Sequence, residues 1–145
     1  MLDTFTINNP IIELLIAALL GAFLGIRREM IAQKSKKKSF MGFRTMTLLA
    51  SMGAISTAFP NMEYLPVVFF FGVLTFLAIA YANGAFNLKR IGLTSEFSAI
   101  LVFWIGVLVG SEQQILAIFL TIFLAFMNAF KKELHSFVGT INQTE

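Results

Sequence analysis

The sequence predicts an all-α, polytopic membrane protein with five transmembrane helices, and two observations carry that prediction. The first is composition: 57 % of the 145 residues are apolar and only 13 % are charged, which departs from soluble globular proteins toward the membrane class. The second is that the apolar residues fall into five runs separated by short polar segments. Lipid is therefore the expected surrounding of most side chains.

A single membrane domain, residues 1–145, is expected to contain the helices. Asn9 followed by Pro10 is typical of a helix start, because Asn caps free amide groups and proline at the first helical position loses no needed hydrogen bond. The first run is roughly 25 Å long at about 1.5 Å per residue, which just spans the hydrocarbon core. The helices are predicted over residues 10–26, 45–59, 64–82, 95–110 and 114–130, followed by a short cytoplasmic tail, 131–145.

The positions of the 11 basic residues predict the orientation of the helices. Segments on the cytoplasmic side of a membrane carry an excess of lysine and arginine. The segment before the first helix, the 60–63 hairpin and the 111–114 turn contain no basic residue, so these belong outside. The chain is therefore predicted to have its N-terminus out and its C-terminus in. The basic residues are Arg27, Arg28, Lys34, Lys36, Lys37, Lys38, Arg44, Lys89, Arg90, Lys131 and Lys132.

Several function classes are excluded or disfavoured. The chain has no cysteine, which removes disulfides, thiol catalysis and cysteine metal sites. A net charge of +3 is explained by membrane topology, so no nucleic-acid partner is expected. No phosphate-binding glycine loop, serine–histidine–acid set or histidine pair on a helix occurs. We expect neither enzymatic activity nor a cofactor.

Small residues recur at intervals of four in the first two predicted helices. Ala17, Gly21 and Gly25 do so in the first helix, and Ala50 and Ala54 in the second. Small residues at this spacing let two membrane helices approach backbone to backbone. These two faces are predicted to pack against each other.

Ionisable residues at membrane depth are costly and are the first candidates for function. Glu13 lies in the first turn of the first helix, where we favour an acid that complements the helix dipole over a cation ligand at a pathway mouth. Glu96 follows Thr94 and Ser95 at the start of the fourth helix. It fits helix-start chemistry and a functional role equally well.

The end of the first helix and the start of the second should meet at the cytoplasmic surface. Glu29 is then in a position to pair with Arg44. One interpretation is interfacial anchoring with an exposed ion pair of little energetic value. The other is a polar cluster of Arg28, Glu29, Arg44 and Glu96 that guards a pathway.

Four motifs resemble the MgtC/SapB family of bacterial membrane proteins. They are LLGAFLGIRREM (19–30), GFRTMTLLA (42–50), GLTSE (92–96) and KKELH (131–135). The last two resemble the branch that joins this domain to a second membrane domain, and only the first domain is expected here. The resemblance carries over site residues Arg28, Glu29, Arg44, Thr45, Thr94 and Glu96. Arg27 stands where the family often has an acid, which removes one potential cation ligand.

The resemblance implies the bacterial inner membrane and a link to magnesium or other cation homeostasis. The first hypothesis is a membrane transport protein or transporter half, with Mg²⁺ or another cation as substrate. Five helices are few for one pathway, so a homo-oligomer or a separately encoded membrane partner is expected in addition to lipid. The alternative is a small regulatory or scaffold subunit that binds another membrane complex and has no transport path.

Overall fold

The computed structural model describes residues 9–34, 41–59, 61–88 and 94–141, with side chains for 9–34, 41–59, 61–83 and 96–129. Within these ranges the chain forms five helices and no strand. The predicted all-α class is therefore confirmed. The helices are α1 (Pro10–Lys34), α2 (Phe43–Thr57), α3 (Leu65–Leu88), α4 (Thr94–Gly110) and α5 (Gln114–Ile141).

Helix α1 begins as the sequence predicts. The side-chain oxygen of Asn9 accepts a hydrogen bond from the amide of Ile11 at 3.0 Å, and Pro10 is the first helical residue. The capping oxygen satisfies one of the amides that an α-helix leaves unpaired at its start.

The helix ends differ from the predicted apolar runs. Helix α1 continues past 26 to Lys34, α3 continues past 82 to Leu88, and α2 begins at Phe43 and ends at Thr57. Helix α5 continues to Ile141, so most of the predicted tail is helical. An apolar run marks the part of a helix that avoids water, whereas arginine, glutamate, lysine and alanine continue the same backbone into water at little cost.

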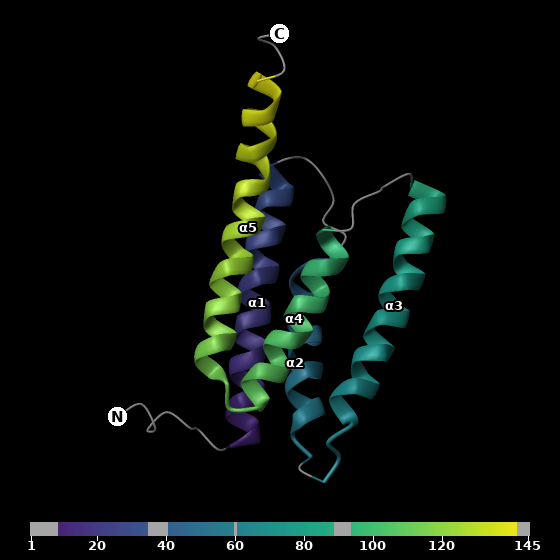
Figure 1. The fold of residues 1–145 in the computed structure, drawn as a ribbon, viewed down its shortest axis with the longest axis vertical. Coiled ribbons are helices and arrows are strands. Elements are labelled where there is room, and N and C mark those ends of the chain that lie inside the picture. Colours follow the sequence, from purple (N-terminus) through teal and green to yellow (C-terminus); the bar gives the residue numbers. More distant parts are fainter. Residues whose placement is uncertain (1–8, 35–40, 60, 89–93, 142–145) are drawn as a thin grey trace.

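Helix α4 lies among the other helices and is the most buried of them (Figure 1). It packs against α1, α2, α3 and α5, and Val102, Phe103 and Ile105 are fully buried. Helix α3 is peripheral and is held mainly by Val73, Leu77 and Phe70, whose ring centroid lies 5.5 Å from that of Trp104. The short fourth helix is therefore covered largely by protein.

The bundle has two ends that recur below. We call one the turn end: it contains the start of α1, the α2–α3 connection and the α4–α5 turn, and lies at the bottom of Figure 1. The other is the loop end, which contains the last turns of α1 and the first turns of α2 and α4. The C-terminal part of α5 extends beyond the loop end.

A backbone crossing between α2 and α4 holds the middle of the bundle together. A Cβ atom on Gly106 would collide with the carbonyl oxygen of Ala50 and lie 3.0 Å from the amide nitrogen of Ala54. A Cβ on Gly53 would collide with the carbonyl oxygen of Phe103. Only glycine permits so close an approach of two helix backbones.

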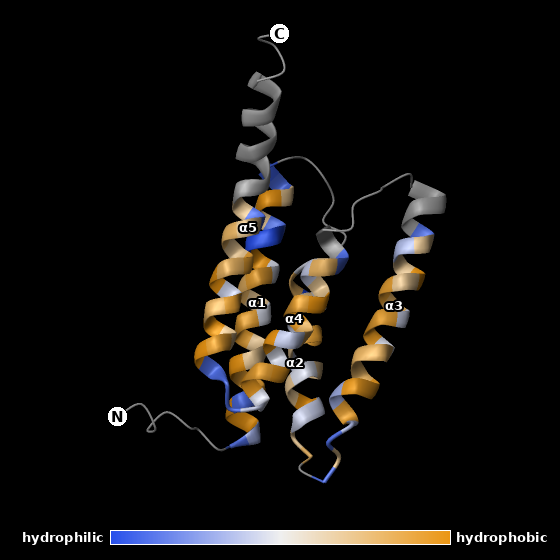
Figure 2. Cartoon of the chain, viewed as in Figure 1, coloured by the Kyte–Doolittle hydropathy of each residue, from blue (hydrophilic) through white to orange (hydrophobic). Residues whose placement is uncertain are grey.

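Among the residues that the structure describes, two helices are long and apolar enough to cross a membrane, over Pro10–Lys34 and Leu65–Asn83. The apolar parts of α4 and α5, Glu96–Gly110 and Gln114–Ala129, are shorter. Apolar residues occupy the middle of the helices and polar residues their ends (Figure 2). Five complete spans and their orientation remain predictions from the sequence.

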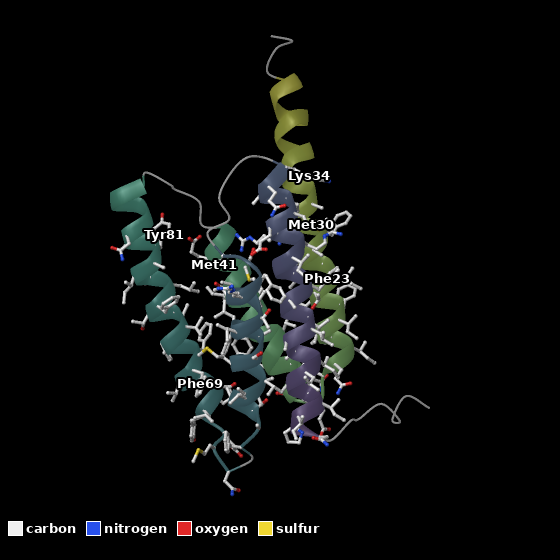
Figure 3. All side chains as sticks on the ribbon, turned by 180° about the vertical axis from the view of Figure 1, so that it is seen from behind. Phe23, Met30, Lys34, Met41, Phe69 and Tyr81 are labelled. Carbon is white, nitrogen blue, oxygen red and sulfur yellow. The ribbon has the colours of Figure 1, made fainter. Side chains whose placement is uncertain are left out.

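The outward faces are apolar. Phe23 and Met30 project from the outer side of α1 (Figure 3), where they are 47 % and 53 % exposed. Phe71 and Phe76 of α3 and Phe119 of α5 are also exposed. Faces of this size and character are uncommon on soluble monomers and typical of contact with lipid or a partner.

Candidate functional site

Opposite charges from two helices meet at the loop end. Arg28 of α1 is half-buried and interacts electrostatically with Glu96 in the first turn of α4. One carboxylate oxygen of Glu96, Oε2, is buried and has no hydrogen-bond partner among the described residues. A buried carboxylate is stable only when a cation or donors compensate it, and Arg28 supplies that charge.

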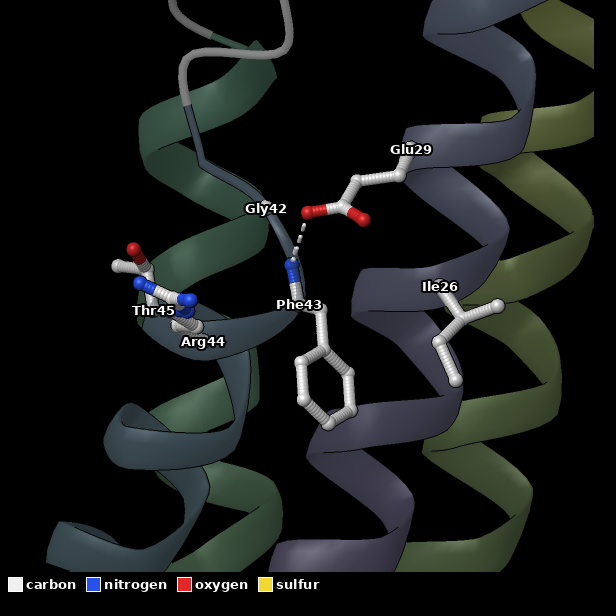
Figure 4. Close-up of a pocket in the computed structure, with 6 residues that line it drawn as sticks. All are labelled: Ile26, Glu29, Gly42, Phe43, Arg44 and Thr45. Atoms are coloured by element: carbon white, nitrogen blue, oxygen red, sulfur yellow. Dashed lines mark hydrogen bonds between the residues drawn. The ribbon is translucent and has the colours of Figure 1, made fainter.

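Glu29 caps the start of α2 from the neighbouring helix. Its Oε1 atom accepts a hydrogen bond of 2.8 Å from the amide of Phe43, the first residue of α2 (Figure 4). The N-cap residue Gly42 provides no side-chain cap, so the Glu29 carboxylate takes that role and faces the positive end of the helix dipole. A Cβ on Gly42 would collide with Glu29, which explains why glycine suits this position.

A pocket of about 590 Å³ opens beside this cap. Its lining combines the acid Glu29 with the base Arg44 and the hydroxyl of Thr45. The other lining residues are Ile26, Gly42 and Phe43. The pocket is open to the surroundings at the loop end, and its lining is a mixture of polar and apolar groups.

The predicted ion pair between Glu29 and Arg44 is not what the two side chains form. Arg44 is exposed and points away from Glu29 in Figure 4, while Glu29 binds the amide of Phe43. Phe43 and Arg44 are consecutive residues of α2, so their side chains lie on different faces of the helix. Glu29 reaches the amide of Phe43, and the Arg44 side chain is directed away from it. Thr94 begins α4, and its side chain lies outside the described residues, as do those of the 131–135 motif.

The small residues predicted for packing lie between α1 and α2 or inside the bundle. A Cβ on Gly21 would lie 2.6 Å from the carbonyl oxygen of Met46 and 2.8 Å from the Cβ of Ala50. Gly25 faces the backbone of Phe43 in the same way. Ala17 and Ala54 are buried. These residues set the distance at which Glu29 meets the start of α2.

Sequence reasoning missed the contact between α2 and α4. The signal was present, because Gly106 and Gly110 repeat the four-residue spacing of Gly21 and Gly25. Gly110 lies against the hydroxyl of Thr57, and a Cβ there would collide with it. The fourth helix therefore has its own small-residue face, and that face brings Glu96 to the loop end near Arg28.

At the turn end, Glu13 is only 7 % exposed, although its sequence position suggested a shallow site. Glu112 of the α4–α5 turn is close enough to repel it electrostatically. Across the described part of the chain, no group of three or more histidine, cysteine or acidic residues is gathered for a metal. The hydroxyls of Ser56, Thr57 and Thr121 bond to carbonyls of their own helices, which is ordinary helix chemistry.

The comparison with protein families decides the identity. The sequence model of the MgtC family matches residues 14–137, a range that includes α2, α3 and α4 and most of α1 and α5. The chain belongs to the MgtC family. The resemblance seen in its motifs is thus confirmed, and membership in this family indicates a membrane protein linked to Mg²⁺ homeostasis. Searches of curated proteins and of solved structures find no match.

Proposed function

We propose that this protein is a membrane transport protein, or one half of a transporter, with Mg²⁺ or another cation as substrate. We assign it to the bacterial inner membrane, with five spans, its N-terminus outside and its C-terminus inside. Membership in the MgtC family supports the link to Mg²⁺. The confinement of Arg27, Arg28, Lys34 and Arg44 to the loop end supports the orientation. We propose no enzymatic activity, cofactor or nucleic-acid partner.

The observation that carries the transport proposal is the presence of opposite charges, Arg28 of α1 and Glu96 of α4, that interact electrostatically at the loop end. Charges at membrane depth are expensive and mark ion pathways more often than they stabilise a fold. The Glu29 cap and the pocket beside it lie at the same end of the bundle. A cation that approaches Glu96 competes with Arg28, so this pair suits a gate that opens when the substrate arrives.

A complete pathway requires more protein than one chain offers. Helix α3 contacts the bundle on one side, and Val67, Phe71 and Phe76 remain exposed on others. We propose that lipid covers part of these apolar faces and that a second copy or a separately encoded membrane protein completes the transporter.

The alternative function, a regulatory or scaffold subunit, depends on a free small-residue face. Gly21 and Gly25 are engaged by α2 within the chain, and Gly106 by the same helix from the other side. Those faces are therefore not available for partner capture. This is the reason to favour transport over the scaffold hypothesis.

The transport proposal is tested with full-length protein in liposomes that contain a Mg²⁺-sensitive dye. The wild-type protein should give faster Mg²⁺ entry than protein-free liposomes, and Glu96→Gln and Arg28→Gln should each reduce that rate. Arg27→Gln is the matched control because Arg27 is the exposed neighbour of Arg28. Wild-type flux equal to that of empty liposomes, or full flux in Glu96→Gln, would contradict the proposal.

The orientation can be tested separately because the chain has no native cysteine. Single cysteines at Asn61 in the α2–α3 connection and at Gln33 near the end of α1 report the two sides. In intact cells a membrane-impermeant thiol reagent should label Asn61→Cys and leave Gln33→Cys unlabelled until the membrane is opened. The reverse pattern would overturn the orientation.

A further inference from the structure

The pocket beside the cap of α2 is lined by two opposite charges that do not pair with each other. Glu29 reaches it from α1 and Arg44 from α2, and their side chains lie on opposite sides of the α2 start in Figure 4. The bond from the amide of Phe43 uses the Oε1 atom of Glu29, and Oε2 takes no part in that bond. The pocket therefore offers a ligand one acid and one base that are held apart.

The pocket lies where the apolar part of α1 gives way to its polar end. Ile26 is the last residue of the first apolar run, and Arg27 follows it (Figure 2). The side chains of Ile26 and Phe43 are exposed beside the charged groups of the pocket. In a helix that crosses a membrane, this change from apolar to charged residues falls at the level of the phospholipid headgroups.

An exposed apolar stripe of α1 leads from the pocket toward the middle of the bundle. Leu19, Phe23 and Ile26 follow one another at intervals of four and three residues, which places them on one face of the helix. All three are exposed, and Phe23 projects outward in Figure 3. An acyl chain that lies along this stripe has its headgroup at the pocket.

The two charges restrict which headgroup fits. A purely anionic headgroup meets the carboxylate of Glu29, and a ligand with only positive charge meets the guanidinium of Arg44. A headgroup with both a phosphate and an ammonium suits the pocket, because the phosphate can bind Arg44 and the hydroxyl of Thr45 while the ammonium binds Glu29. A primary ammonium also has three N–H donors for the carboxylate, whereas a quaternary ammonium has none.

We propose that this pocket binds one phospholipid with a phosphoethanolamine headgroup. Ile26 and Phe43 then contact the glycerol and the upper part of the acyl chains. The volume of about 590 Å³ lies in the range of small-ligand sites, about 300–1,000 Å³. The site requires only that the chain is embedded in a membrane, and it does not depend on the transport proposal.

The test is native mass spectrometry of the full-length protein in detergent. The protein is titrated separately with phosphatidylethanolamine, phosphatidylcholine and phosphatidylglycerol that have the same acyl chains. The wild-type protein should bind its first phosphatidylethanolamine about fivefold more tightly than either other lipid, the size of effect expected from one charged contact near water. Equal affinities for the three lipids would show nonspecific lipid association and overturn the site.

Two variants separate the roles of the two charges. Arg44→Gln should weaken phosphatidylethanolamine binding about fivefold, because it removes the partner of the phosphate. Glu29→Gln keeps a side-chain oxygen that can accept the bond from Phe43, but it removes the negative charge. This variant should therefore prefer phosphatidylglycerol, a reversal that misfolding does not produce. Unchanged lipid preference in Glu29→Gln would contradict the proposal.

The matched control is Arg27→Gln, because Arg27 is exposed at the same end of the bundle and does not line the pocket. It removes the same charge as Arg44→Gln and should leave the affinity within about twofold of wild type. Equal losses in the two arginine variants would show general attraction of lipid to the basic end of the bundle and overturn the site.

A competition experiment distinguishes a lipid from a soluble ligand with the same chemistry. Free phosphoethanolamine in excess should not displace phosphatidylethanolamine, because it lacks the chains that contact Ile26 and Phe43. Displacement would identify a soluble zwitterion as the ligand and overturn the lipid assignment. A protein with the expected lipid preference but no Mg²⁺ flux would leave this site intact and reject only the transport proposal.

Discussion

The two ends of the bundle carry acids in different surroundings: Glu29 and Glu96 at the loop end are half-buried, and Glu13 at the turn end is buried. At the loop end, Glu96 has Arg28 opposite it and Glu29 has the amide of Phe43. At the turn end, Glu13 has only another acid, Glu112, close to it. Burial of a carboxylate costs the same kind of desolvation energy at both ends. At the loop end Arg28 and the amide of Phe43 offset that cost, whereas the turn-end segments contain no lysine or arginine.

This difference follows from the distribution of basic residues. Positive residues that hold a membrane protein in its orientation gather on one side, and here the same residues provide partners for acids on that side. The opposite side has acids and no bases. A charge pattern that sets topology thus also decides at which end of the bundle an acid finds a positive partner.

The largest effect on stability is expected at the crossing of α2 and α4. In Gly106→Ala the new methyl group collides with the Ala50 carbonyl, and neither backbone can yield without separation of α2 from α4. We expect a loss of about 3 kcal/mol in stability, measured as the thermal unfolding midpoint in detergent. The matched control is Gly72→Ala, because a Cβ there has no neighbour within 4 Å. Equal midpoints for the two variants would contradict the crossing.

The next effect tests compensation at the loop end. Arg28→Gln leaves Glu96 buried without its cation and should cost about 1–3 kcal/mol. Glu96→Gln should cost less, because it leaves a partly buried arginine that can extend toward water. The double variant should be more stable than the sum of the two losses predicts. Strict additivity in this cycle would show that the two charges do not interact.

A smaller effect is expected at the cap of α2. Gly42→Ala places a methyl group where the Glu29 carboxylate lies and should cost about 1 kcal/mol, the usual value of a lost N-cap. Amide hydrogen exchange of Phe43 provides a local measurement and should accelerate. Unchanged exchange would mean that Glu29 keeps its bond to Phe43 by another route.

The smallest effect distinguishes the turn end from the loop end. Without divalent cations, Glu112→Gln removes a repulsion and should stabilise the protein by less than about 1 kcal/mol, since Glu112 is exposed. The measurement is the unfolding midpoint of both proteins in a chelator. Glu112→Gln that is less stable than wild type in the chelator would argue against an uncompensated acid pair.

Much of the fold was predictable because hydrophobicity is a local property. Five apolar runs predicted five helices, and the Asn9–Pro10 pair predicted where the first one begins. The helix ends were not predictable in the same way, since residues such as Arg28 and Glu29 continue a helix outside the apolar region. The sequence predicted which residues belong to the candidate site. It did not predict their contacts, because Glu29 accepts a hydrogen bond from the amide of Phe43 at the start of α2 and does not pair with Arg44.

The sequence by itself determined the fold class, the family motifs and the confinement of positive charge to a few segments, because each depends on which residues are neighbours along the chain. Only the tertiary structure decided that α4 crosses α2 at Gly106, that Glu96 and Arg28 interact electrostatically, and that Glu13 is buried. The reason is that a contact between distant residues depends on how closely two backbones approach. The distance between two helix backbones is set by the sizes of the side chains on both helices. It cannot be inferred from the sequence of one helix alone.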